Sequence, residues 1–347
     1  MQLKTSVVVA VIVGLTLLLG WELYLRSSKK TITLLDDNSA LWAVQRHRVP
    51  NLDDEQIVII GSSRILFDVQ LDVWEDKTGI RPVELATVGS SPLPIFHDLV
   101  NNTEYTGTIM VGVTPGLFFS TTYPKAEPWS WPQARVDHYA DRTYADRSNH
   151  YLSIPLQKAF YFISAEEDKS SDNVDLKAIL SRIHIGPRGP EPEIPFPQFS
   201  EIETDRSLRM TAITATDTSV ANTVQRAWLS IIMDPDMPPP DPVSTTNFFL
   251  KDARKFLDRG GKLIMVRCPS SGPLAQGEQK FLGREGFWDP LIDSLNVPAY
   301  NYLDYEQLTG YECPEWSHLK YEDALTFTND LVDIMLKDDV ITNLKTQ

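Results

Sequence analysis

The chain has 347 residues, of which 42% are hydrophobic and 23% are charged, so it is long enough to bury a full core. Its formal net charge of -15 argues against a nucleic-acid partner, because phosphate binding needs clustered Lys and Arg. We therefore expect one large domain with additions and an acidic, solvated surface.

The first 30 residues are interpreted as a membrane anchor. The segment Thr5–Leu25 is almost entirely apolar and is long enough to cross a bilayer as a helix. No small-x-small cleavage site follows Leu19, which favours a retained anchor in contact with the membrane through residues 5–25 over a cleaved signal peptide. Aromatic and basic residues typical of a membrane interface come at its end: Trp21, Tyr24, Arg26, Lys29 and Lys30. Arg26, Lys29 and Lys30, which follow the apolar segment, outnumber the positive charges before it, which are Lys4 and the amino terminus. The positive-inside rule therefore favours a cytoplasmic domain.

Residues 31–55 are polar and mixed and are expected to form a stalk, and the main domain is expected to span residues 56–347. The run Ile57–Ile60 consists of four β-branched residues, which predicts a short strand buried on both faces. Gly61-Ser62-Ser63 follows it, a pattern that is either a simple turn or a sharp strand-to-helix junction with a hydroxyl at the carboxyl edge of a sheet.

Strands and helices then alternate along most of the chain, which predicts an α/β fold with a three-layer, doubly wound, mostly parallel sheet of five strands. Residues 120–244 interrupt this alternation, hold most of the prolines and are expected to form a folded insertion. Within it we expect helices over residues 174–183 and 223–233, and a packed apolar segment over residues 151–162. The expected strands are Ile57–Ile60, Arg81–Ala86, Thr108–Val113, Lys262–Arg267 and Ala299–Leu303.

A carboxylate and an imidazole stand together just before the last expected helix. Glu315 and His318 are three residues apart, so the carboxylate can hold the imidazole Nδ1–H while Nε2 faces outward, as in the base of a serine nucleophile. An isolated Glu-x-x-His is more often a capping or surface pair. Here both this pair and Ser63 follow strands of one parallel sheet, so they should reach the same edge.

These blocks resemble those of the SGNH, or GDSL-type, hydrolase family, whose fold is a flavodoxin-like sheet of the expected kind. Gly61-Ser62-Ser63 is similar to the Gly-Asp-Ser block, which implies that Ser63 is the nucleophile. Glu315-x-x-His318 is similar to the Asp-x-x-His block. Gly89 resembles the second-block glycine that helps bind the oxyanion, together with the Ser63 amide. Thr114 stands where the family has an asparagine, so only its hydroxyl remains for this role.

The N-terminal anchor and the insertion are similar to those of membrane-anchored SGNH proteins that act on acyl groups of cell-envelope polysaccharides. The resemblance implies an extracytoplasmic domain, against the positive-inside rule, and either a polysaccharide or an acyl-donor partner. Two hypotheses follow. The first is a serine esterase or O-acyltransferase; the second is a weakly active or inactive module that binds a polysaccharide or an assembly partner. Thr114 favours the second hypothesis, whereas the intact Ser63, Glu315 and His318 favour the first, which we expect.

Other residues at the same edge carry smaller expectations. Arg64 and Arg267 are candidates for substrate binding, although Arg64 is equally suited to pair with an acidic residue. Cys268 and Cys313 are expected near this edge, where they form either a disulfide or two separate buried thiols. The scattered histidines and the two cysteines show no metal-ligand spacing, so no metal or other cofactor is expected.

Overall fold

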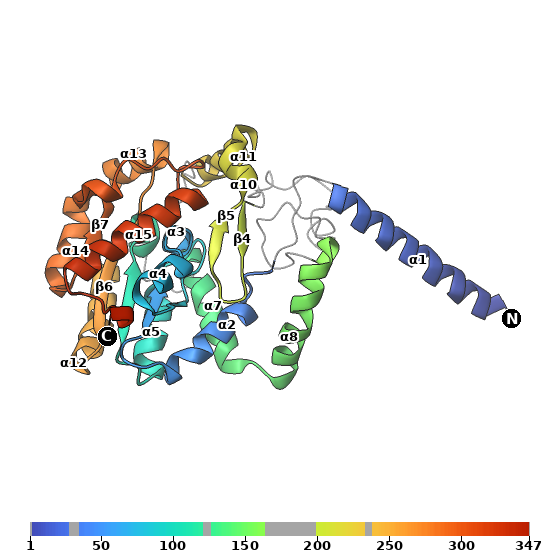
Figure 1. Ribbon diagram of the computed structural model, residues 1–347, viewed down its shortest axis with the longest axis horizontal. Helices are drawn as coiled ribbons and strands as arrows, with labels where there is room; N and C mark the ends of the chain where they lie inside the picture. Colours follow the sequence, from blue (N-terminus) through green and yellow to red (C-terminus); the bar gives the residue numbers. More distant parts are fainter. Residues whose placement is uncertain (1, 28–34, 121–125, 164–198, 233–237, 347) are drawn as a thin grey trace.

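The computed structural model describes residues 2–27, 35–120, 126–163, 199–232 and 238–346. Its centre is a five-stranded sheet with the order β2-β1-β3-β6-β7, in which all neighbouring strands are parallel (Figure 1). The five strands agree with the expected ones to within a few residues at their ends: β1 (Ile57–Ile60), β2 (Val83–Glu84), β3 (Thr108–Gly112), β6 (Lys262–Arg267) and β7 (Ala299–Asn301).

Helices cover both faces of the sheet because successive side chains of each strand point to opposite sides. Ile57 and Ile59 of β1 enter the core beneath α3 (Ser63–Asp68), α4 (Leu71–Thr78) and α15 (Tyr321–Lys337). Val58 and Ile60 enter the core on the other face. That face is covered by α2 (Ser39–Arg48), α5 (Leu93–Asn102), α12 (Pro242–Asp258) and α14 (Trp288–Leu295). The protein is therefore a three-layer α/β structure.

The segment expected as a stalk belongs to the domain from Leu35 onward. Helix α2 buries Trp42 completely, and the Trp42 indole Nε1–H donates to the Leu85 carbonyl at 3.0 Å. A fully buried tryptophan with its N–H satisfied contributes apolar burial and fixes the position of the helix. Five of the ten residues of α2 are buried, so this part of the expected stalk packs on the domain. Residues 28–34 lie outside the described part.

The described parts of residues 120–244 pack onto the same two cores. They contain α7 (Glu127–Asp141), α8 (Tyr144–Ala159), the antiparallel pair β4 (Ser200–Ile202) and β5 (Leu208–Met210), α10 (Ala212–Thr216) and α11 (Thr218–Ile232). Trp129 joins one core, and Ile202 and Met210 join the other. The helix expected over residues 174–183 lies outside the described residues.

The apolar segment from Tyr151 to Phe162 was expected to be packed, and the structure differs. Tyr151 and Leu152 are 63% and 70% exposed, and Leu156 is also exposed. The segment forms the end of α8 and a 3-10 turn, η2 (Tyr161–Ile163). Only His150 and Gln157 of α8 are buried. Apolar composition thus predicted burial where the helix turns its apolar side chains outward.

Helix α1 (Gln2–Ser27) extends away from the domain (Figure 1). Among the described residues it is the one helix long and apolar enough to cross a membrane, over Leu3–Ser27. Its carboxyl-terminal end contacts η2, where the Glu22 carboxylate accepts hydrogen bonds from the amides of Tyr161 and Phe162 at 3.2 and 3.3 Å. These features support a single N-terminal anchor, and its orientation in the membrane stays a prediction.

Candidate active site

A close approach of backbone segments places Ser63 at the carboxyl edge of the sheet. At Gly61 a Cβ atom would come 2.5 Å from Cγ2 of Ile65 and 3.1 Å from Cα of Gly112, so only glycine fits between α3 and β3. The chain therefore turns directly from β1 into α3, and Ser63 is the first residue of that helix. The turn is the strand-to-helix junction, not a simple surface turn.

Ser63, His318 and Glu315 form a continuous chain of hydrogen bonds. The Ser63 Oγ lies 2.8 Å from Nε2 of His318, and Nδ1 of His318 lies 2.9 Å from Oε1 of Glu315. The same Oε1 accepts the backbone N–H of His318 at 2.6 Å. A hydroxyl, an imidazole and a carboxylate joined in this order are the parts of a nucleophile, its base and the group that orients the base.

Packing around the imidazole fixes its orientation. His318 and Glu315 are fully buried, and Ser63 is 6% exposed. The ring of Phe67 stacks on that of His318 with their centroids 4.1 Å apart, and Phe199 stacks at 5.8 Å. A buried imidazole packed against aromatic rings has few alternative rotamers, so the Ser63 hydrogen bond is held in place.

Trp228 of α11 completes the surroundings of Glu315, and the sequence analysis did not identify it. Its indole Nε1–H donates to Oε2 of Glu315, the oxygen that His318 does not use. The two residues are separated by 87 positions in the chain, and an indole carries no motif that would link it to a carboxylate. Helix α11 thus contributes a donor to the candidate site from within residues 120–244.

Three groups were expected to donate to an oxyanion: the amides of Ser63 and Gly89 and the hydroxyl of Thr114. Each of them has a different environment in the structure. The Ser63 amide lies in the first turn of α3, where amides have no intrahelical acceptor. Gly89 has the left-handed φ of 59° in the loop after β2, and a hydrogen bond from the Thr87 amide to the Gly61 carbonyl joins this loop to the Ser63 turn. The Thr114 hydroxyl is engaged with the Ser62 hydroxyl at 2.5 Å.

Arg64 and Arg267 share one buried carboxylate, that of Glu278 in α13 (Gly272–Phe281). Arg64 donates to both oxygens of Glu278, with Nη1 at 3.1 Å and Nη2 at 2.5 Å, and Arg267 Nη2 lies 3.4 Å from Oε2. Burial acts to raise the pKa of Glu278, but the Arg64 charge and hydrogen bonds outweigh it and lower the pKa. Both arginines are buried, so the structure places them in an internal ion cluster with Glu278.

This ion cluster also joins the segments that carry Ser63 and His318. Arg64 follows Ser63 directly, and its Nε donates to the Ser317 hydroxyl, which precedes His318, at 3.3 Å. A second link is the Asp68 carboxylate, whose Oδ1 accepts the amide of Leu319 at 3.0 Å. Burial raises the pKa of Asp68 well above its ordinary value. Both ends of α3 are therefore bonded to the His318 loop.

Cys268 and Cys313 are both buried free thiols, so the structure does not contain the disulfide that was one of the two expectations. Burial raises the pKa of each thiol well above its ordinary value, which keeps both protonated near neutral pH. Both belong to the apolar core that also holds Phe67 and Leu319. They therefore act as small apolar side chains behind the candidate site.

Within the described residues no group of three or more His, Cys, Asp or Glu side chains is arranged to hold a metal ion. The arrangement is suited to nucleophilic attack by a serine hydroxyl. Comparison with known proteins adds no assignment: no family model matches the chain, and no curated protein matches its sequence.

Proposed function

We propose that this protein is a membrane-anchored serine esterase or O-acyltransferase of the SGNH type. The observation that carries the proposal is the hydrogen-bond chain from Ser63 Oγ through His318 to Glu315. The resemblance of the surrounding sequence blocks, and their position at the carboxyl edge of a parallel sheet, support the family assignment. A fold alone does not define an activity, so the proposal rests on the geometry of Ser63, His318 and Glu315.

The proposed reaction begins with attack of Ser63 Oγ on the carbonyl carbon of an ester, as its proton passes to Nε2 of His318. Glu315 stabilises the imidazolium that forms. His318 then returns the proton to the departing alcohol oxygen, which leaves the acyl group on Ser63. Water or a sugar hydroxyl next attacks this acyl-enzyme and gives its proton to His318. The tetrahedral intermediate formed by this attack then breaks its bond to Ser63 Oγ, and His318 returns the proton to that oxygen.

The substrate class proposed is an acylated glycan of the cell envelope, and the domain is proposed to be extracytoplasmic. Support comes from the anchor helix α1 and from the resemblance to envelope-acting SGNH proteins. The folded elements within residues 120–244 are consistent with an insertion that shapes the substrate site, because α11 reaches Glu315.

A second candidate is a weakly active or inactive SGNH-like module that binds a polysaccharide or an assembly partner. The observation that favours it is Thr114, whose hydroxyl is engaged with Ser62. Loss of one oxyanion donor typically costs about 100- to 1,000-fold in rate. The hydrogen-bonded Ser63 and His318 favour the enzyme.

Labelling with a fluorophosphonate probe tests the choice, because such probes react with an activated serine hydroxyl. We expect the probe to modify Ser63, as identified by peptide mass, and we expect Ser63→Ala to abolish labelling. Ser62→Ala is the matched control, since the Ser62 hydroxyl bonds to Thr114 and not to His318. Modification that maps to Ser62, or that persists in Ser63→Ala, would reject the assignment. An unlabelled wild-type protein would favour the binding module.

A further inference from the structure

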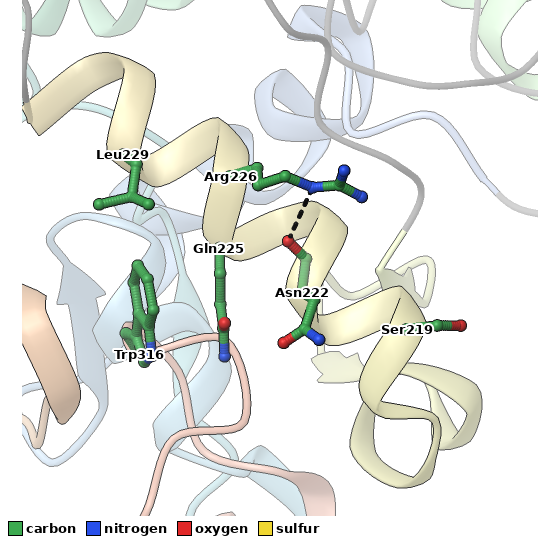
Figure 2. Close-up of a pocket in the computed structure, with 6 residues that line it drawn as sticks. All are labelled: Ser219, Asn222, Gln225, Arg226, Leu229 and Trp316. Carbon is green, nitrogen blue, oxygen red and sulfur yellow. Dashed lines mark hydrogen bonds between the residues drawn. The ribbon is translucent and has the colours of Figure 1, made fainter.

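A cavity of about 460 Å³ lies beside the catalytic loop, between α11 and Trp316. Its lining combines one aromatic ring with polar and aliphatic side chains from a single side of α11: Ser219, Asn222, Gln225, Arg226 and Leu229. Figure 2 shows Trp316 beside Gln225 and below Leu229, whereas Arg226 folds back over Asn222. A mixture of one flat apolar surface and several polar groups is typical of a site for a small polar ligand.

Trp316 is held in a costly conformation. Its φ of 79° is left-handed, which is rare for a bulky side chain. Its indole lies against Gly272, where a Cβ atom would come 2.6 Å from Cδ1 of the ring. The amide of Ser271 donates to the Trp316 carbonyl at 2.9 Å and helps to hold the turn. Strain of this kind persists where the surroundings impose it, and it occurs preferentially at binding and catalytic sites.

Trp316 and helix α11, which form the two walls of the cavity, are both connected to the segment that carries the catalytic residues. Trp316 lies between Glu315 and His318 in the sequence, so a ligand on its ring contacts the segment that carries the base. On the other wall, the Gln225 side chain donates to the Pro314 carbonyl at 2.9 Å, and Trp228 on the same helix donates to Glu315. A ligand in the cavity would therefore sit next to the catalytic loop.

We propose that this cavity is a subsite for one sugar ring of the glycan, an inference that rests on the proposed function. The apolar C–H face of a sugar ring packs on an indole, and its hydroxyls both donate and accept hydrogen bonds. Amides do both as well, and Asn222 and Gln225 provide two of them. Arg226 at the rim adds one cation, so a uronate and a neutral sugar are distinguishable ligands.

Binding is measured by titration calorimetry on the full chain in detergent, carrying Ser63→Ala so that no ester chemistry intervenes. The probes are cellohexaose, chitohexaose and hexagalacturonate. We expect at least one to bind, and we expect Asn222→Ala to weaken its affinity about tenfold. Asn222 is exposed, so its truncation leaves the core intact. The matched control is Ser230→Ala, on the same helix but outside the cavity.

Absence of binding by all three probes at about 10 mM would overturn the subsite. Equal affinities in the Asn222→Ala and Ser230→Ala proteins would place the sugar elsewhere and would overturn it too. Fluorophosphonate labelling of the wild type separates this result from the proposed chemistry. Sugar binding by an unlabelled protein supports the subsite and rejects the esterase. A labelled protein that binds none of the sugars keeps the esterase and rejects the subsite.

Discussion

The indole of Trp228 supports the base through the carboxylate, since it donates to the Glu315 oxygen that faces away from His318. Trp228→Phe removes this donor and keeps most of the ring packing on His318. We expect kcat for an aryl ester to fall about tenfold with little change in KM, because Glu315 is then held less firmly beside the imidazolium that forms in the transition state. An equal loss in Ser230→Ala, or a wild-type kcat, would contradict the assigned role.

Glu84 is a buried carboxyl on the edge strand β2, and only its Oε1 has a partner in the described part of the chain, the Ala86 amide. Burial raises its pKa from 4.5 to about 8. Between these values the unfolded chain releases the proton and the folded protein keeps it, so the free energy of unfolding falls as the pH rises from about 4.5 to about 8. Above that range the effect is constant.

Glu84→Gln should therefore remove this part of the pH dependence. We expect the variant to gain stability relative to the wild type as the pH rises through this interval, by up to a few kcal/mol. Urea unfolding at several pH values, followed by tryptophan fluorescence, measures the difference. A constant difference between the two proteins across the range would show that Glu84 titrates normally.

At the scale of elements, α13 supplies the carboxylate that holds α3, β6 and the His318 loop together. Glu278 bonds to Arg64 and Arg267, and Arg64 bonds to Ser317. The sequence indicated both arginines but not their shared partner, because nothing in the spacing of Glu278 distinguishes it from a solvated helix residue. Both arginines are buried against Glu278, and their expected role in substrate binding stays a prediction.

Glu278→Gln leaves two buried guanidiniums without an anion, and we expect it to lower the free energy of unfolding by about 3 kcal/mol. The matched control is Asp304→Asn, which breaks an exposed pair with Arg284 and should cost less than about 1 kcal/mol. Denaturant unfolding of both variants provides the measurement. Similar small losses in the two would show that the cluster contributes little.

The five strands were predicted correctly, most clearly β1, β3 and β6, which are short runs of mainly apolar residues because they are buried on both faces of the sheet. The junction into α3 was one of two expectations for Gly61-Ser62-Ser63, but the extent of this six-residue helix was not predicted. The β4–β5 pair was missed because strands of three residues show no clear alternation. The expected meeting of Ser63, His318 and Glu315 is observed, and their catalytic roles stay a prediction. Trp228 was missed because its role requires only a nearby N–H.

At the scale of the whole molecule, the direction of α1 decides which side of the membrane the domain faces. We expect a reporter fused after Gln347 to be active only outside the cytoplasm, as the proposed envelope function requires. The opposite orientation is favoured by Arg26 at the end of α1 and by Lys29 and Lys30, which follow it in the sequence. Arg26 is paired with Glu22 at 2.6 Å. Reporter activity confined to the cytoplasm would reject the envelope function. A fusion after Arg26, with no domain attached, is the control for the anchor itself.

The hydroxyl and the imidazole that meet at 2.8 Å are 255 positions apart in the chain. Contacts between such distant segments form late, because a long loop must be closed before the contact can stabilise it, and the N-terminal part of a chain is synthesised first. Ser63 is thus without its base until α15 has been made and has packed on α3. Under the proposed function, the reactivity of Ser63 would consequently report that the His318 segment has packed on α3, and a chain interrupted before His318 would carry an unactivated serine.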